Sequence, residues 1–350
     1  MRGWAYRARG KPEYVLKLES DLPQPTAESL GPHEVLVKVK YAALFQGSAA
    51  MMTFMPHFNN NPWIAENNYS GTIVATGSEV EHVAVDDDVF GGFAADVLRK
   101  YGGVLAEYVT LPDHVVVRRP NNVTLKDIAG MGAGGVTAMQ FAEAAGLKKD
   151  DRVLITGASG GMGTLVIQAA RAAVGDNGLV VGTCSAGNEQ LVKELGVHQI
   201  VDYKKHKHLH KYLTENYSLE PFDAIIDMVG EDYSILKNSS PYLKPDGIFI
   251  FGGNMPLIHG GGTVLDMIGW FIRIKIAQTM PLFLGGMPRK CVMHAGQISR
   301  DALMRLAAFI EDGKMTPVVD SLIEMDQVLQ GYARLATSRA RGKLIVHVQD

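Results

Sequence analysis

Apolar residues follow two different patterns along the chain. Over residues 1–120 they form short runs with strand-like spacing, separated by turn residues such as Gly31-Pro32 and Gly102-Gly103. Met1–Arg7 is expected to be a first strand leading into the fold. The other expected strands are Tyr14–Leu18, Val35–Tyr41, Gly71–Thr76, Asp88–Phe90, Ala106–Leu111 and Val115–Arg118. This part predicts a compact, mostly antiparallel β domain.

The pattern becomes helical over Thr124–Leu147 and alternates between strands and helices from Arg152 onward. The expected strands are Val153–Thr156, Leu179–Thr183, Gln199–Asp202, Ala224–Met228 and Ile248–Phe251. The helices expected between them are Gly161–Val174, Asn188–Leu195, His206–Tyr217 and Asp232–Ser240. Strands that alternate with helices of this length predict a parallel, doubly wound sheet and hence an α/β fold class.

Residues 254–288 interrupt this alternation with an apolar insertion that is punctuated by glycine. Its Met-rich part, Met255–Met287, fits an apolar substrate pocket or a dimer surface, and core filling explains it equally well. The remaining pattern predicts a strand near Cys291–His294, a helix at Asp301–Glu311, a β run at Val318–Ile323, a helix at Met325–Ala336 and a strand at Leu344–Val348.

A glycine-rich turn lies inside Asp151–Arg171, between a buried strand and a helix. Its four glycines (Gly157, Gly160, Gly161 and Gly163) leave little side-chain bulk, so a phosphate group can approach the backbone. The helix that follows directs its free N–H groups and the positive end of its dipole toward the same place. Strand, turn and helix together predict the phosphate-binding site of a dinucleotide-binding fold.

Composition narrows the class of protein. Of 350 residues, 47% are hydrophobic and 20% charged, which is typical of a folded globular chain, and a net charge of −3 gives no support to nucleic-acid binding. Two cysteines, Cys184 and Cys291, suit a reducing, cytoplasmic location and exclude a disulfide framework. No signal-peptide or transit-peptide pattern is expected at the N-terminus. The most apolar segment, Val264–Gly286, contains Asp266, Arg273 and Lys275, so we expect no membrane-spanning helix, while association with a membrane surface stays open.

Several motifs together resemble one family. They are GPHEVLVKV at Gly31–Val39, DDDVFG at Asp86–Gly91, GGVLAEYV at Gly102–Val109, VLITGASGGMG at Val153–Gly163, ELGVHQIVDY at Glu194–Tyr203 and RGKLIVHV at Arg341–Val348. Over nearly its full length the chain resembles a zinc-free medium-chain dehydrogenase/reductase of the quinone oxidoreductase or enoyl reductase type. The resemblance implies a GroES-like, β-rich catalytic domain at 1–122 and 298–350, together with a Rossmann domain at 123–297.

The end of the second Rossmann strand favours NADPH as the cofactor. NAD-binding chains usually carry Asp or Glu here for the ribose 2′-OH, whereas this sequence reads Thr183-Cys184-Ser185-Ala186. In similar NADPH reductases a Ser, a nearby base and a Tyr hold the 2′-phosphate. Ser185 and Tyr203 match that pattern, but Gly187 and Asn188 stand where the base is common. Lys193, Lys204 or Arg339 are alternative sources of positive charge, and a mere helix-capping role for Ser185 stays open.

Other cofactor contacts follow from the resemblance. The pyrophosphate is expected along the glycine-rich turn, and the nicotinamide ribose or carboxamide near the inter-domain helix. Glycines that end the fourth and fifth strands are expected to face the cofactor, although Gly252-Gly253 also fits a simple strand-ending turn. The full set of expected cofactor contacts is Thr137, Ala158, Ser159, Gly160, Gly161, Met162, Ser185, Asn188, Tyr203, Val229, Gly252, Gly253 and Arg339.

The positions of the family's zinc ligands hold other residues here. Zinc-dependent relatives carry a Cys after the strand at Val35–Ala42 and a His about twenty residues later, whereas this chain reads Phe45-Gln46-Gly47-Ser48 and Glu66-Asn67-Asn68. We therefore expect no metal ligands and no alcohol oxidation. The expected reaction is hydride transfer from NADPH to a small apolar quinone or α,β-unsaturated carbonyl, whose reduction needs a donor for the carbonyl oxygen and a proton source.

Candidates for those two tasks are Gln46 as the donor and Tyr69 or His57 as the proton source. Each has a simpler interpretation: Gln46 could bond only a loop carbonyl, and His57, beside Pro56 and Phe58, could be a surface or packing residue. The basic stretch Lys204–Lys211 is read as a solvated helix start rather than a metal or nucleic-acid site. A homodimer stays open, as do two rival functions: a cofactor-binding protein without redox turnover, and a non-redox enzyme with this fold.

Overall fold

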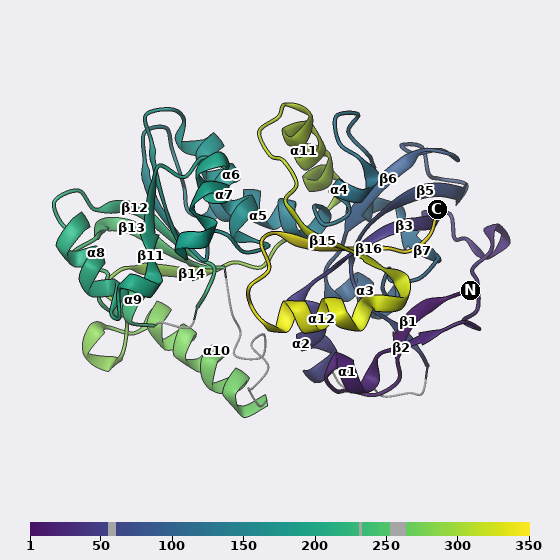
Figure 1. Cartoon of the computed structure of the whole chain (residues 1–350), viewed down its shortest axis with the longest axis horizontal. Coiled ribbons are helices and arrows are strands. Elements are labelled where there is room, and N and C mark those ends of the chain that lie inside the picture. The colour runs from purple at the N-terminus through teal and green to yellow at the C-terminus, as the bar shows by residue number, and fades with distance from the viewer. Residues whose placement is uncertain (55–60, 231–232, 253–263) are drawn as a thin grey trace. The chain divides into compact units, whose positions relative to one another are not determined.

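The computed structural model describes residues 1–54, 61–230, 233–252 and 264–350 (Figure 1). It forms two compact units, Met1–Thr137 with Gly296–Asp350, and Ala138–Ala295. The division after Thr137 lies further along the chain than the expected one after residue 122. The difference arises because helix α5 (Gly132–Ala144) begins on the first unit, where the Ala133 N–H donates to the Asn68 side-chain oxygen over 2.8 Å.

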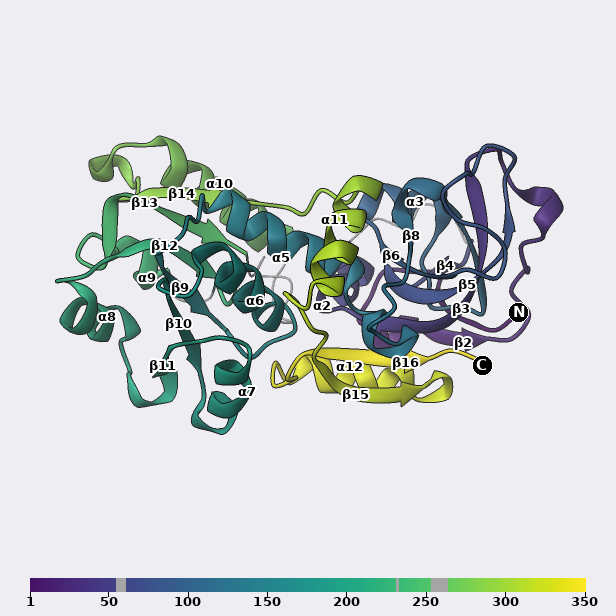
Figure 2. The ribbon, with the colours of Figure 1, turned by 90° about the horizontal axis from the view of Figure 1, so that it is seen from above.

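The β-rich unit contains a seven-stranded sheet in the order β15-β16-β3-β5-β6-β8, with β7 paired to β3 (Figure 2). All pairs are antiparallel except β15 with β16. A smaller sheet has the order β2-β1-β4. The strands are β1 (Gly3–Tyr6), β2 (Lys17–Glu19), β3 (Glu34–Leu44), β4 (Trp63–Ile64), β5 (Asn68–Thr76), β6 (Asp88–Gly92), β7 (Tyr108–Pro112), β8 (Val116–Arg118), β15 (Val319–Glu324) and β16 (Lys343–His347).

Six helices accompany these strands in the described part of the β-rich unit. They are α1 (Pro12–Val15), α2 (Gln46–Phe54), α3 (Ala95–Tyr101), α4 (Leu125–Ile128), α11 (Arg300–Glu311) and α12 (Val328–Ala336). The expected strand at Tyr14–Leu18 is wrong in its first half, which is helical. Pro12 at the first helical position explains the difference, because its fixed φ favours a helix start.

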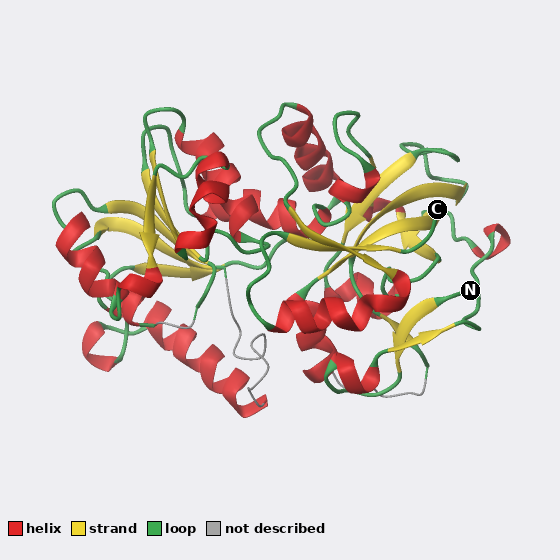
Figure 3. Cartoon of the chain, viewed as in Figure 1, coloured by secondary structure: helices red, strands yellow, loops and turns green. Residues whose placement is uncertain are grey.

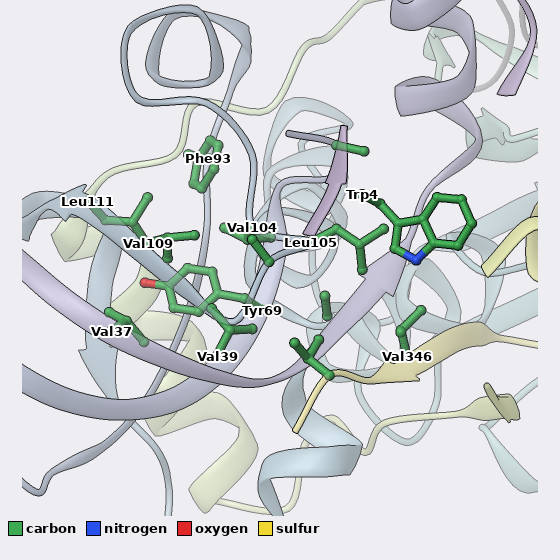
Figure 4. Close-up of a cluster of buried hydrophobic side chains, with 14 of the residues drawn as sticks. Trp4, Val37, Val39, Tyr69, Phe93, Val104, Leu105, Val109, Leu111 and Val346 are labelled. Carbon is green, nitrogen blue, oxygen red and sulfur yellow. The ribbon is translucent and has the colours of Figure 1, made fainter. Parts of the chain in front are cut away.

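The core of the β-rich unit consists of buried apolar residues from many of its strands, several of which are buried along nearly their whole length. Val37, Val39, Tyr69, Leu111 and Val346 are each 5% exposed or less, and Figure 4 shows them within one cluster of buried hydrophobic side chains. Four of them, Val37, Val39, Leu111 and Val346, lie in the apolar runs that predict strands.

The second unit is a six-stranded parallel sheet in the order β11-β10-β9-β12-β13-β14. Its strands are β9 (Arg152–Thr156), β10 (Leu179–Cys184), β11 (Gln199–Asp202), β12 (Phe222–Asp227), β13 (Leu243–Phe251) and β14 (Lys290–Met293), and its helices beyond α5 are α6 (Gly163–Val174), α7 (Glu189–Glu194), α8 (Leu209–Tyr217), α9 (Ser234–Lys237) and α10 (Val264–Thr279) (Figure 3). The predicted doubly wound sheet is confirmed. The strand order reverses at β9, and ligands bind such sheets beyond the carboxyl ends of the strands at this point.

The insertion at 254–288 contains α10, which has a buried apolar side and which also exposes apolar residues next to charged ones. Ile274 and Ala277 are buried on one side, whereas Leu265, Ile268 and Ile272 are 47% exposed or more. Core filling therefore explains only one face of this helix. Among the described residues no helix is long and apolar enough to cross a membrane.

Candidate functional site

The glycine-rich turn after β9 is tied to the neighbouring strand β10. The Gly157 N–H donates to the Thr183 hydroxyl over 3.1 Å, and the Ala158 N–H donates to the Thr183 carbonyl over 3.0 Å. Gly157 has φ +60°, in the left-handed region that glycine adopts without strain. The hydrogen bonds to Thr183 therefore hold the start of the turn against β10.

Gly163 sits where the turn enters α6. A Cβ atom there would lie 2.1 Å from the Gly157 carbonyl oxygen, far inside van der Waals contact. A Cβ atom on Gly160, by contrast, would have its nearest neighbour at 3.4 Å. The close approach at Gly163 aligns the first turn of α6 with the end of β9, so that the helix dipole faces the turn.

A buried acid that the sequence interpretation missed, Asp227, shapes the end of β12. Its carboxylate accepts hydrogen bonds from the Val229 and Gly230 N–H groups, each over 3.1 Å, and from the Thr156 hydroxyl. The Gly252 N–H donates to the Asp227 carbonyl over 2.9 Å. Asp227 thus fixes the ends of three adjacent strands, including the expected contacts Val229 and Gly252. Its signal in the sequence is an acid at the last position of an otherwise apolar strand.

At the end of β10, Ser185 is half-buried and precedes a short 3₁₀ turn without making a side-chain cap hydrogen bond to it. The alternative role as a helix cap is therefore not what the structure shows. Asn188 donates from its side-chain amide to the Ser159 hydroxyl over 2.8 Å, which joins the β10 end to the glycine-rich turn. Its side-chain oxygen is buried and has no partner among the described residues.

One acid, Asp202, lies close to the end of β10 and is already hydrogen-bonded. Asp202 lies beside Cys184 in the parallel register, but its carboxylate accepts the Lys204 N–H over 3.0 Å. Tyr203 follows and is 50% exposed. Ser185 and Asn188 follow β10, and Tyr203 follows the paired strand β11, so the residues after these two strands offer hydroxyl and amide groups.

The remaining expected cofactor residues lie elsewhere or outside the description. Thr137, whose hydroxyl donates to the Ala133 carbonyl over 2.7 Å, and Arg339 both belong to the β-rich unit. Gly253 and the expected proton source His57 lie outside the described residues.

The structure corrects the proposed role of Tyr69. The side chain is 0% exposed, and its hydroxyl donates to the Val115 carbonyl over 3.3 Å within the hydrophobic core (Figure 4). Burial raises the pKa of Tyr69 far above its ordinary value. A phenol in this position cannot reach a substrate, so Tyr69 is a core residue. Gln46, in contrast, is half-buried at the first position of α2.

Replacing Tyr69 by phenylalanine tests this correction. The change removes one hydrogen bond to a buried carbonyl, so the free energy of unfolding should fall by about 1–2 kcal/mol in a denaturant titration. The turnover number should stay within a factor of two or so of the wild type, because the core remains filled. A loss of turnover without a loss of stability would restore Tyr69 as a proton source.

Comparison with known proteins shows which family has these features. A profile described as "Alcohol dehydrogenase GroES-like domain" matches residues 31–121, and one described as "Zinc-binding dehydrogenase" matches residues 195–346. The chain is 30% identical over 384 aligned positions to a trans-enoyl reductase, poxH of Penicillium oxalicum, covering 100% of this chain and 98% of that protein. The chain belongs to the medium-chain dehydrogenase/reductase family, in its enoyl reductase/quinone oxidoreductase branch.

Three further proteins are similar to this medium-chain reductase in sequence or in fold. It is 28% identical to an NADPH-dependent alkenal/one oxidoreductase of Arabidopsis thaliana, covering 99% of this chain and 79% of that protein. Its fold matches the quinone oxidoreductase of Coxiella burnetii with a TM-score of 0.77 and 24% identity, covering 100% and 99% of the two chains. The Escherichia coli quinone oxidoreductase complexed with NADPH matches with a TM-score of 0.75 and 17% identity, covering 99% of this chain and 100% of that chain.

As a medium-chain reductase the chain is an oxidoreductase that uses a nicotinamide cofactor, and the residues of the second unit fit one. The glycine-rich turn offers backbone N–H groups, and the buried Asn188 oxygen is an acceptor that lacks a donor. In the described part of the chain, no three His, Cys, Asp or Glu side chains lie close enough together to bind a metal ion.

Proposed function

We propose that this medium-chain reductase uses NADPH to reduce an activated C=C bond of an α,β-unsaturated carbonyl compound, or a quinone. The observation that carries the proposal is the full-length similarity to a trans-enoyl reductase. Gln46 and Asn67, in the stretches that hold metal ligands in zinc-dependent relatives, support it because amides are poor zinc ligands and good hydrogen-bond donors.

Preference for NADPH over NADH rests on the end of β10. Ser185 offers a hydroxyl that makes no cap hydrogen bond. The carboxylate of Asp202, on the neighbouring strand, accepts a hydrogen bond from the Lys204 N–H. A 2′-phosphate would find hydroxyl donors here, from Ser185 and the half-exposed Tyr203, and β10 itself ends without an acid. Lys204 and Arg339 remain the proposed sources of positive charge.

Bound NADPH supplies the hydride for the β-carbon of the substrate. The chain itself must then stabilise the negative charge that develops on the carbonyl oxygen and allow a proton to reach the α-carbon. We assign the first task to the side-chain amide of Gln46, at the start of α2. His57 remains the proposed proton source, and solvent is the alternative.

The substrate is proposed to be hydrophobic, such as a lipid-derived enone or another specialised metabolite. The support is the apolar insertion, in which α10 keeps Leu265, Ile268, Phe271 and Ile272 at least 41% exposed. Apolar surface of this extent is costly in water unless a ligand or a partner covers it. A second copy of this chain is the other proposed cover.

Following the absorbance of reduced nicotinamide with a panel of quinones and enones tests the proposed function. We expect oxidation of NADPH with at least one enone class, and faster turnover for longer apolar chains. Tight NADPH binding without oxidation across the panel would instead support a cofactor-binding protein without redox activity. Conversion of a substrate without any change in NADPH would support a non-redox enzyme.

Replacing Gln46 by alanine should lower kcat for an enone by roughly 100-fold if its amide stabilises the developing oxyanion. The KM for NADPH should not change, because Gln46 is assigned to the substrate and is not among the proposed cofactor contacts. Gln349→Ala is a matched control: that amide donates to the Val39 carbonyl over 3.2 Å in the same unit, away from α2. The control should lose stability but keep kcat. Unchanged turnover in both Gln46→Ala and His57→Ala would remove these residues from the mechanism.

A further inference from the structure

Glu66 is a buried acid that lies beside the loop between β3 and α2. Its side chain is 1% exposed, and its backbone has φ +69°, a left-handed conformation that is uncommon for residues with a side chain. Burying a carboxylate is costly unless hydrogen bonds replace the lost water. The Glu66 carboxylate therefore needs hydrogen-bond donors from inside the protein.

Three donors converge on this carboxylate. The Phe45 N–H donates to Oε1 over 3.2 Å, the Ser48 hydroxyl donates to Oε2 over 2.8 Å, and the Tyr332 hydroxyl of α12 also donates to Oε1. All three groups offer hydrogens, so the ionised form of Glu66 can accept every one of them. The three donors together therefore form a binding site for the Glu66 carboxylate.

Two of these hydrogen bonds bracket Gln46. Phe45 precedes it and Ser48 follows two positions later, and the Ser48 N–H donates back to the Phe45 carbonyl over 3.0 Å. Between them, a Cβ atom on Gly47 would lie 2.2 Å from a ring carbon of Phe45, so the ring packs closely over this glycine. Glu66 thus holds the Phe45 backbone and the Ser48 side chain, one on each side of the residue to which we assign the oxyanion.

The titratable groups around Glu66 set its charge. Burial raises the pKa of Glu66 to about 7, while the three hydrogen bonds and the positive charge of Lys343 act in the opposite direction. Burial lowers the pKa of Lys343 to about 8, and Glu66 opposes that shift. Tyr6 and Tyr332 also face the site, and burial raises the pKa of Tyr6 to about 12 and that of Tyr332 well above its ordinary value. Both phenols therefore stay neutral in any assay near neutral pH.

We propose that Glu66 is a positioning residue for catalysis: its carboxylate holds the Phe45–Ser48 segment, which is the loop residue Phe45 and the first turn of α2, so that the Gln46 amide is fixed before substrate binds. The proposal rests on the proposed function, since it assigns Gln46 to the substrate. Such preorganisation matters because a donor that must reorient during the reaction stabilises the transition state less.

Variants of Glu66 and Tyr332 test this role. Glu66→Gln replaces an acceptor oxygen by an NH₂ group that opposes the Ser48 or Phe45 donor, so kcat for an enone should fall by roughly 10-fold or more. The dissociation constant of NADPH should not change. The wild type should show an ionisation near the pKa of Glu66, with higher kcat/KM when the carboxylate is charged, and Glu66→Gln should lack it. Tyr332→Phe removes one donor to the carboxylate and should displace this ionisation to higher pH.

Ser70→Ala is the matched control for a merely structural role. Ser70 is 0% exposed, and its hydroxyl donates to the Leu125 carbonyl over 2.5 Å, away from the loop. The control should be less stable than the wild type but keep the pH profile and the KM of the enone. Glu66 variants that behave like Ser70→Ala, losing stability with an unchanged pH profile, would overturn the proposal.

Hydrogen–deuterium exchange of the loop provides a readout that needs no turnover. In the wild type without substrate, the Phe45 amide should exchange slowly at pH 8, and in Glu66→Gln at least 10-fold faster, because its acceptor is lost. If the wild type oxidises NADPH with no enone or quinone, the proposed function has failed, yet faster exchange would still support the anchoring of the loop by Glu66. Unchanged exchange in both Glu66→Gln and Tyr332→Phe would overturn that anchoring.

The same carboxylate predicts a pH dependence of stability. Because the folded pKa of Glu66 lies above the value of 4.5 for an exposed Glu, its contribution to stability is fully present below that value and is lost as pH rises through about 7. The Lys343 shift acts in a separate window above pH 8. The Tm of the wild type relative to Glu66→Gln should therefore fall between pH 4.5 and pH 7 and then level off. A constant difference across this window would contradict the buried-carboxylate interpretation.

Discussion

Replacing Gly163 by alanine is expected to weaken NADPH binding by roughly 10- to 100-fold. The added Cβ atom would lie 2.1 Å from the Gly157 carbonyl oxygen and 2.8 Å from the carbonyl carbon and oxygen of Ala158. These neighbours are backbone atoms, so no side-chain movement can relieve the overlap, and the turn must separate from α6. Calorimetric titration with NADPH measures the loss, and the Tm of the cofactor-free protein should fall as well.

Two other glycines of the same unit are controls for this change. Gly160 lies in the same turn, but the nearest atom to its added Cβ is at 3.4 Å, so Gly160→Ala should leave the Tm of the cofactor-free protein almost unchanged. Gly269, in α10, has no atom within 4 Å of an added Cβ, so Gly269→Ala should preserve both Tm and NADPH affinity. Normal NADPH affinity in Gly163→Ala would show that the turn does not hold the pyrophosphate.

Replacing Ser185 by aspartate should shift the cofactor preference from NADPH toward NADH by roughly 100-fold. A carboxylate at the end of β10 would repel the 2′-phosphate, since like charges about 4 Å apart repel by ~1 kcal/mol in water and ~4 kcal/mol near a protein surface. The same carboxylate can accept the ribose 2′-OH of NADH. The ratio of the dissociation constants for the two cofactors measures the shift.

Ser185→Ala separates the loss of the hydroxyl from the addition of charge. It should weaken NADPH binding by roughly 10-fold without improving NADH binding, because it removes one hydrogen bond to a charged group. A wild type that binds NADH more tightly than NADPH would contradict the cofactor preference itself. Unaltered preference in Ser185→Asp would show that the 2′-phosphate is held away from this strand end.

The features that could be predicted from the sequence depend on local patterns. Short apolar runs bounded by turn residues mark the strands of the β-rich unit, and β9, its turn and α6 follow from an apolar run, glycines and helical spacing. The division between the units was harder, because α4 and the start of α5 look like the beginning of the second unit but pack against the first. Contacts that lie far apart in sequence decide such boundaries.

The roles of Tyr69, Glu66 and Asp227 could not be predicted from the sequence, because they depend on contacts between distant parts of the chain. Alternation shows that Tyr69 faces one side of a strand, but only the packed structure shows that its hydroxyl ends inside the core. Glu66 and Asp227 look like ordinary surface acids until their partners are known. Their donors come from Phe45, Ser48 and Tyr332 in one case and from Thr156, Val229 and Gly230 in the other.

The hydrogen bonds around Glu66 can be completed only late in the synthesis of the chain, because one of their donors lies near its C-terminal end. Tyr332 follows Glu66 by 266 positions, and β16 pairs with β3 across a similar separation. The dinucleotide-binding unit, Ala138–Ala295, is contiguous and emerges from the ribosome before those partners do. A ribosome-bound chain stalled before residue 328 would thus contain the whole unit Ala138–Ala295. It would still lack Tyr332 of α12, which donates to the Glu66 carboxylate that holds the segment around Gln46. Most of the proposed dinucleotide contacts would then be in place before the anchor of Gln46 is complete.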